Sequence, residues 1–126
     1  MGGSGPVESL SAVTLVTGDM GASVRFYEAL GFRVLYGGPG SPFTSFEVGS
    51  GFLNLQAGAG ADGVARWAGW GRIIFWVDDV DAMHARAVAA GAVPSTSPAD
   101  APWGERYFHV EDPDGHELSF ARPLAR

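Results

Sequence analysis

Residues 102–120 read PWGERYFHVEDPDGHELSF, and this stretch predicts two short β-strands joined by a tight acidic turn. In both strands, 106–110 and 116–120, apolar and polar residues alternate. A period of two residues indicates a sheet with two different faces. The DPDG sequence at 112–115 suits a turn, because proline fixes φ and glycine supplies a positive φ. The stretch therefore predicts a β-hairpin.

The polar face of this hairpin is the first candidate for function. The alternation places Tyr107 and His109 on one face of the first strand, and Glu117 and Ser119 on one face of the second. The opposite faces carry Phe108 and Val110 on the first strand and Leu118 and Phe120 on the second, which suits packing on a core. We therefore expect these four polar side chains to point toward a ligand or a polar partner.

Composition restricts the class of protein. The chain has 126 residues, 46% of them hydrophobic, which suits one compact domain. It has no cysteine, so thiolate metal sites and cysteine nucleophiles are excluded. The net charge of −6 argues against a nucleic-acid partner. No apolar run is long enough to span a membrane, and residues 1–9 resemble a flexible leader and no signal peptide, so we expect a cytoplasmic protein without a membrane partner.

The chain before this hairpin contains a repeated pattern. Asp19 and Asp79 each stand where a helix N-cap belongs, and Gly31 and Gly91 each follow 12 positions later as helix stops. A β-α-β-β-β order in each half accounts for the pattern. It predicts a first module at 10–56, a linker at 57–71 and a second module at 72–123. The expected helices are 20–30 and 80–90, and the expected strands are 10–17, 32–36, 43–48, 52–56, 72–77, 93–97, 106–110 and 116–120.

Three motifs carry a resemblance to a known family: RFYEALGF at 25–32, VDDVDA at 77–82 and WGERYFHVEDPDGH at 103–116. With the repeat, they resemble the vicinal oxygen chelate superfamily, which includes glyoxalases, extradiol dioxygenases and bleomycin-resistance proteins. The resemblance covers nearly the whole chain. It implies an α+β fold in which two βαβββ modules curl their sheets into an open cup. It also implies a homodimer and a site inside the cup.

The resemblance also implies where a metal would bind, and here the sequence departs from the family pattern. Metal-dependent members carry His or Glu on the first and fourth strands of each module. The matching positions in this chain are Ala12, Asn54, Arg72 and Ser119. Alanine offers no donor, arginine is permanently charged, and serine and asparagine are weak ligands. We therefore expect no metal and no other cofactor.

Side chains expected inside the cup are the candidate ligand-binding residues. Trp76 alternates with residues that face the helices, so its indole is either a stacking wall or dimer packing. Three loop tryptophans, Trp67, Trp70 and Trp103, suggest a lid or a subunit interface. The candidate ligand-binding residues are Thr14, Phe52, Asn54, Arg72, Trp76, Trp103, Tyr107, His109, Glu117 and Ser119.

Two functions follow from these expectations. The first is a metal-free protein of the bleomycin-resistance type that sequesters a cationic, aromatic compound in the cup. The alternative is a lyase, isomerase or dioxygenase of the same superfamily, with a nonstandard metal site or none. In that case His109 and Glu117 are the acid–base candidates. A structural dimer with a vestigial cup is a third reading.

Overall fold

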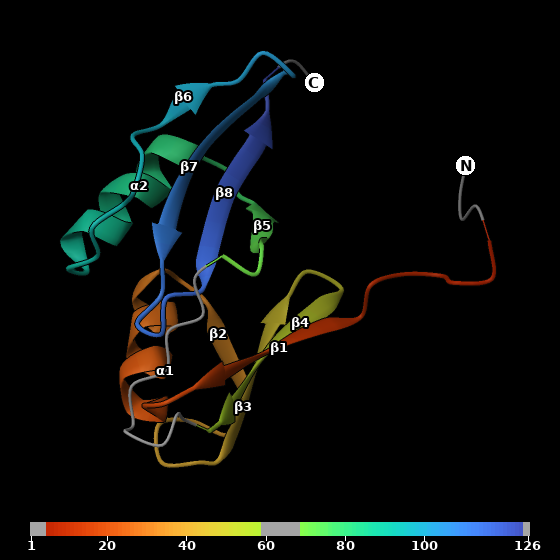
Figure 1. The fold of residues 1–126 in the computed structure, drawn as a ribbon, viewed down its shortest axis with the longest axis vertical. Coiled ribbons are helices and arrows are strands. Elements are labelled where there is room, and N and C mark those ends of the chain that lie inside the picture. Colours follow the sequence, from red (N-terminus) through yellow and green to blue (C-terminus); the bar gives the residue numbers. More distant parts are fainter. Residues whose placement is uncertain (1–4, 59–68, 125–126) are drawn as a thin grey trace.

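The structure is a computed structural model that describes residues 5–58 and 69–124. It contains two four-stranded mixed sheets, each accompanied by one helix, with both helices on the same side of the molecule (Figure 1). The expected α+β fold with two βαβββ modules is confirmed. Residues 59–68 of the expected linker, which include Trp67, lie outside the described residues.

The first sheet has the strand order β1-β4-β3-β2, with β1 parallel to β4 and the other pairs antiparallel. Strand β1 passes from this sheet into a segment, residues 5–11, that runs away from the body of the molecule (Figure 1). The elements are β1 (Ala12–Thr17), α1 (Met20–Ala29), β2 (Arg33–Tyr36), β3 (Phe43–Val48) and β4 (Gly51–Ala57).

The second sheet repeats this topology in the order β5-β8-β7-β6, with β5 parallel to β8. Strands β7 and β8 form the predicted hairpin, and Gly115 takes a positive φ of 89° in its turn. The elements are β5 (Arg72–Trp76), α2 (Val80–Ala89), β6 (Ala99–Asp100), β7 (Glu105–Glu111) and β8 (Glu117–Pro123).

Both helices begin and end as predicted. The side chains of Asp19 and Asp79 accept hydrogen bonds from the backbone N–H groups of Ala22 and Ala82. These N–H groups lie in the first helical turn, where no backbone carbonyl of the helix is available to accept from them. Gly31 follows α1 with a φ of 103°, a conformation that costs glycine little. The repeated Asp and Gly positions in the sequence therefore mark the start and end of one capped helix in each module.

One predicted strand is wrong. The expected strand 93–97 is irregular, and the only strand between α2 and β7 is the two-residue β6. Pro94 and Pro98 have no N–H to donate to a strand ladder. The segment still lies alongside β7. The N–H of Ser95 donates to the carbonyl of His109, and Thr96 Oγ1 accepts from the N–H of His109.

Side chains from both modules form one hydrophobic core. Phe32, just before β2, contacts Phe75 of the second module edge-on at 5.1 Å and also lies near Phe120 at 6.4 Å. Tyr27 of α1 packs against Phe32 from the other side, at 5.3 Å. These ring contacts therefore join the two modules. No helix in the described chain is long and apolar enough to cross a membrane.

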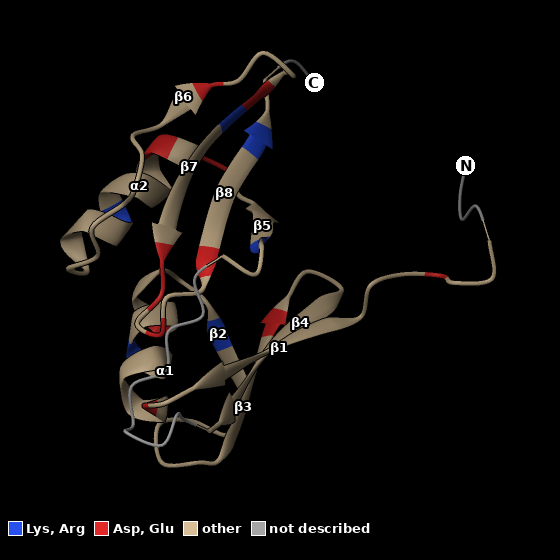
Figure 2. Cartoon of the chain, viewed as in Figure 1, with Lys and Arg blue, Asp and Glu red and all other residues tan. Residues whose placement is uncertain are grey.

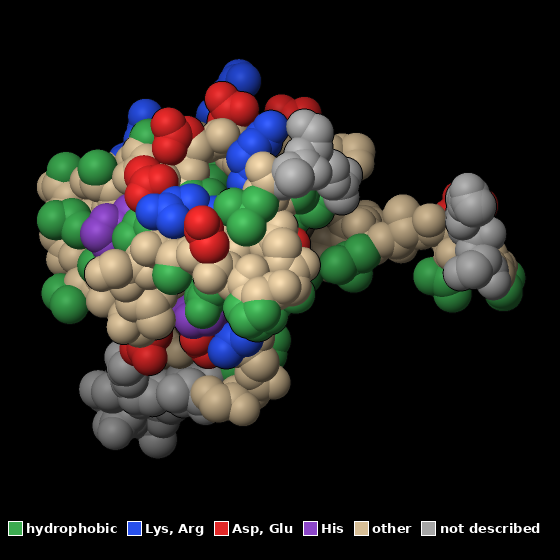
Figure 3. Space-filling model, turned by 90° about the horizontal axis from the view of Figure 1, so that it is seen from above, with side chains coloured by type: hydrophobic (Ala, Val, Ile, Leu, Met, Phe, Trp, Pro, Cys, Tyr) green, Lys and Arg blue, Asp and Glu red, His purple; other side chains and the backbone are tan. Residues whose placement is uncertain are grey.

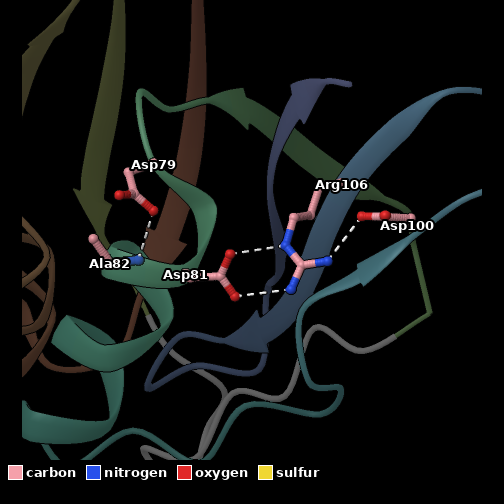
Figure 4. A network of polar contacts seen from close by, with 5 residues as sticks. All are labelled: Asp79, Asp81, Ala82, Asp100 and Arg106. Atoms are coloured by element: carbon pink, nitrogen blue, oxygen red, sulfur yellow. Dashed lines mark hydrogen bonds and ion pairs between the residues drawn. The ribbon is translucent and has the colours of Figure 1, made fainter. Parts of the chain in front are cut away.

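Arg106 ties α2, β6 and β7 together (Figure 4). Its guanidinium donates two hydrogen bonds to Asp81, at 2.8 and 2.9 Å, and one to Asp100 at 2.8 Å. The hydrogen bond from Arg106 lowers the pKa of Asp81. Seen from above in Figure 3, basic and acidic side chains stand next to one another at this end of the molecule. The network is solvent-exposed, so it serves mainly to place the short β6.

Candidate functional site

The face of the second sheet that points away from α2, here called the open face, is a grid of side chains in three rows. The pairing of β5, β8 and β7 places residues of the three strands side by side. This grid contains Tyr107, His109, Glu117 and Ser119, as the alternation in the sequence predicts. The rows are Arg72, Glu117 and Glu111; Ile74, Ser119 and His109; and Trp76, Ala121 and Tyr107.

Aromatic rings dominate one end of the open face. Trp103 stacks on Tyr107 at 5.8 Å and 28°, and Tyr107 contacts the His109 ring at 5.0 Å. The indole of Trp103 is 69% exposed and that of Trp76 is 62% exposed. Ala121 lies between Trp76 and Tyr107 and is buried, because larger neighbours stand on both sides. The result is an exposed aromatic platform, formed by Trp76, Trp103 and Tyr107.

Charged groups occupy the other end of the open face. Arg72 Nη2 and Glu117 Oε2 form an ion pair at 3.4 Å, with Glu111 next to Glu117 across the hairpin. Both partners of the pair are partly exposed, so the interaction is screened by water. A further carboxylate lies at the aromatic end of the face, where the indole Nε1 of Trp103 donates to Glu105 at 3.2 Å. Figure 2 shows several charged positions along β7 and β8, whereas β1 and β4 carry none.

His109 lies between the charged row and the aromatic platform. Its Nδ1 is buried and accepts or donates no hydrogen bond within the described chain. Burial lowers the pKa of His109, and the nearby Arg72 cation lowers it further, while Glu117 acts in the opposite direction. The imidazole is therefore predominantly neutral at neutral pH, and its Nδ1 has unused hydrogen-bonding capacity.

The candidates on the first sheet form a separate, uncharged group. Asn54 Nδ2 donates to Thr14 Oγ1 at 3.2 Å, across the paired strands β4 and β1. Phe52 is 38% exposed on the same face of β4. A hollow of about 260 Å³ is lined by residues of both sheets, including Phe52 and Ile74. Of the candidate ligand-binding residues, Phe52 lines this hollow.

The four positions at which metal-dependent relatives carry ligands do not suit a metal here. Ala12 and Asn54 lie on the first sheet, and Arg72 and Ser119 on the second. A guanidinium already paired with Glu117 would repel a cation placed beside it. Among the described residues, no three His, Asp or Glu side chains gather into a metal-binding group. The residues present therefore do not fit the metal that the family pattern implies.

The 112–116 turn also joins the two modules, which its sequence did not indicate. Both carboxylates are buried against α1 of the first module. Asp114 accepts from the N–H of Gly18 at 2.8 Å and from Ser23 Oγ at 3.1 Å, and Asp112 accepts from the hydroxyl of Tyr27 at 2.7 Å. No sequence pattern links partners 85 to 96 positions apart.

Comparison with known proteins agrees with this architecture. The family model described as Glyoxalase/Bleomycin resistance protein/Dioxygenase superfamily matches residues 9–120. The crystal structure of TioX from Micromonospora sp. ML1 is 30% identical, covers 92% of this chain and 99% of its own, and superposes with a TM-score of 0.74. A glyoxalase-related enzyme from Fulvimarina pelagi is 27% identical over 91% of this chain and 88% of its own, with a TM-score of 0.73.

A curated relative matches over a shorter stretch. A protein of Mycobacterium tuberculosis is 48% identical over 48 residues. That match covers 38% of this chain and 28% of the mycobacterial protein. The match therefore indicates homology over those 48 residues alone.

Proposed function

Because the chain belongs to the Glyoxalase/Bleomycin resistance protein/Dioxygenase superfamily, we propose that it is a metal-free protein that sequesters a small planar cation on the open face of its second sheet. The observation that carries this proposal is the aromatic platform of Trp76, Trp103 and Tyr107. Large exposed rings on one sheet face favour stacking of a planar ligand.

The charges around the platform favour a cation. Glu105 lies beside Trp103, and Glu111 and Glu117 lie at the far end of the same face, where Arg72 pairs with Glu117. A cation above an indole ring also gains from the negative potential of the ring face. Arg72, which is partly exposed beside Glu117, would donate to a carbonyl or hydroxyl group elsewhere on the ligand.

Tryptophan fluorescence tests this proposal with proflavine, a planar aromatic cation, and 9-anthracenecarboxylate, a planar anion. We expect proflavine to quench and to bind more tightly than the anion. Trp103→Ala and Trp76→Ala should each weaken proflavine binding about fivefold or more, which corresponds to about 1 kcal/mol. Tyr36→Phe, an exposed aromatic position on β2, is the control and should leave binding unchanged. Equal binding of both probes, or unchanged binding in both alanine variants, would refute the stacking role.

We further propose that the protein is a homodimer. Within the described chain, β1 and β5 are each paired on one side only, and β5 exposes Ile74 and Trp76. Exposed edges with apolar side chains promote pairing with another chain. Sedimentation of the wild type should give a dimer, and Ile74→Lys should shift it toward monomer. A monomeric wild type would contradict the proposal.

A second candidate function is acid–base catalysis, which the environment of His109 favours. A neutral imidazole near the Glu117 carboxylate suits proton transfer to or from a bound substrate. The protein would then be a lyase, isomerase or dioxygenase of the superfamily. If His109→Gln and Glu117→Gln leave a detected turnover intact, neither side chain transfers the proton.

A further inference from the structure

The buried side chain of His116 joins three segments that are distant in the sequence. Its Nε2 lies 2.9 Å from the carbonyl oxygen of Val16, at the end of β1 in the first module. Its Nδ1 accepts a hydrogen bond of 3.1 Å from the indole Nε1 of Trp70, just before β5. The two rings meet nearly edge to face, at 5.9 Å and 74°. His116 itself closes the turn between β7 and β8, so one imidazole links both modules.

The hydrogen bonds at the two ring nitrogens of His116 together require one tautomer. A carbonyl oxygen can only accept, so Nε2 must carry the hydrogen. An indole N–H can only donate, so Nδ1 must carry none. The contact therefore requires the neutral imidazole. A protonated imidazole would set one N–H against another, and the hydrogen bond from Trp70 would be lost.

The contact lies just beyond the charged row of the open face. Arg72 and Glu117 are paired residues at the first step of the β5–β8 ladder. Trp70 precedes Arg72 by two positions, and His116 directly precedes Glu117. The hydrogen bond between Trp70 and His116 therefore holds the start of β5 against β8.

Charged and titratable groups surround His116 on several sides. The turn contributes Asp112 and Asp114, whose carboxylates accept hydrogen bonds from α1 and its N-terminus. From α1, the titratable group is Tyr27, which is hydrogen-bonded to Asp112. Arg72 and Glu117 form the adjacent ion pair. Proton uptake by His116 would take place within this set of groups.

We propose that His116 is a proton-sensitive latch between the modules. In its neutral form it fastens the start of β5 and the end of β1 to the 112–116 turn, and proton uptake releases Trp70. The latch loosens the position of Arg72 as the pH falls. It is independent of what the open face binds.

The test follows the Trp70 indole resonance in a ¹⁵N-labelled protein as the pH falls from about 8 to about 5. Trp70→Phe assigns the resonance. We expect the Trp70 indole N–H to shift toward its free position, while far-UV circular dichroism reports that the protein stays folded. His116→Gln can make both hydrogen bonds and cannot titrate, so its Trp70 resonance should stay constant.

Two results would overturn the latch: a Trp70 resonance that does not titrate in the wild type, or one that titrates equally in His116→Gln. If His116→Gln does not fold, thermal melting of Trp70→Phe replaces it. The stability difference between wild type and Trp70→Phe should shrink at the lower pH, because both proteins then lack the hydrogen bond. A difference that stays constant would refute the latch. Neither measurement uses a ligand, so failure of the proposed binding function would leave it standing.

Discussion

Replacing Tyr27 by phenylalanine removes one buried hydrogen bond and little else. The Tyr27 hydroxyl donates to Asp112 Oδ2 at 2.7 Å, and both residues are buried. A hydrogen bond to a charged group contributes about 1.5–3 kcal/mol. The phenylalanine ring would keep its packing against Phe26 and Phe32. We therefore expect Tyr27→Phe to lower the free energy of unfolding by about 2 kcal/mol, and the melting temperature by about 8 °C.

Urea denaturation followed by circular dichroism measures this loss. Tyr36→Phe is the matched control, because Tyr36 is 66% exposed, and its free energy of unfolding should change by less than about 0.5 kcal/mol. Asp112→Asn removes the charge of the acceptor, so Tyr27→Phe should cost less in that background. The double-mutant cycle then isolates the energy of this one contact between the modules.

If Tyr27→Phe is no more destabilising than Tyr36→Phe, the reasoning is refuted. The 112–116 turn would then rest against α1 without stabilising it. A full loss that persists unchanged in the Asp112→Asn background would also contradict it, because the loss would then come from somewhere other than the charged hydrogen bond.

Three further predictions follow from the titration and capping of individual residues. Burial raises the pKa of Tyr27 well above its usual value. As the pH rises above about 10, the unfolded chain therefore loses this proton before the folded protein does, and the free energy of unfolding should fall. In Tyr27→Phe the urea midpoint should fall less over the same pH range. Burial lowers the pKa of His109. As the pH falls below about 6.5, the unfolded chain therefore takes up a proton before the folded protein does, and the free energy of unfolding should fall. The urea midpoint, measured above and below this pH, should fall less in His109→Gln than in the wild type. Asp79→Ala removes the N-cap of α2 and should cost about 1 kcal/mol in thermal denaturation, whereas a cost no larger than that of Asp78→Ala would contradict the capping role.

The elements predicted from the sequence depended on local signals, and most were correct for that reason. Asp19 and Asp79 each precede a helical apolar pattern, and Gly31 follows the first one, so caps and stops coincide with the periodicity. The alternation in the hairpin correctly placed His109 and Ser119 side by side on one face. The strand expected at 93–97 followed from the repeat, but Pro94 inside this segment and Pro98 just after it cannot donate to a strand ladder.

The parts of the site that could not be predicted depend on contacts between distant segments. The partner of Trp70 is His116, 46 positions away, and nothing near either residue indicates the other. The sequence indicated a lid or an interface for Trp70, and the structure gives it a partner in the turn. Likewise, Asp112 and Asp114 read as ordinary turn residues, because their hydrogen bonds reach across to the other module.

The central claim is that the open face binds its ligand by stacking and hydrogen bonding without a metal, and metal titration tests it most directly. Chelator-treated protein is titrated calorimetrically with Zn²⁺, Ni²⁺, Mn²⁺ and Fe²⁺ in turn. With Ala12, Asn54, Arg72 and Ser119 at the positions of the family's metal ligands, we predict no stoichiometric binding at micromolar protein. A tight site with one metal ion per chain would contradict the claim and make the enzyme the leading function.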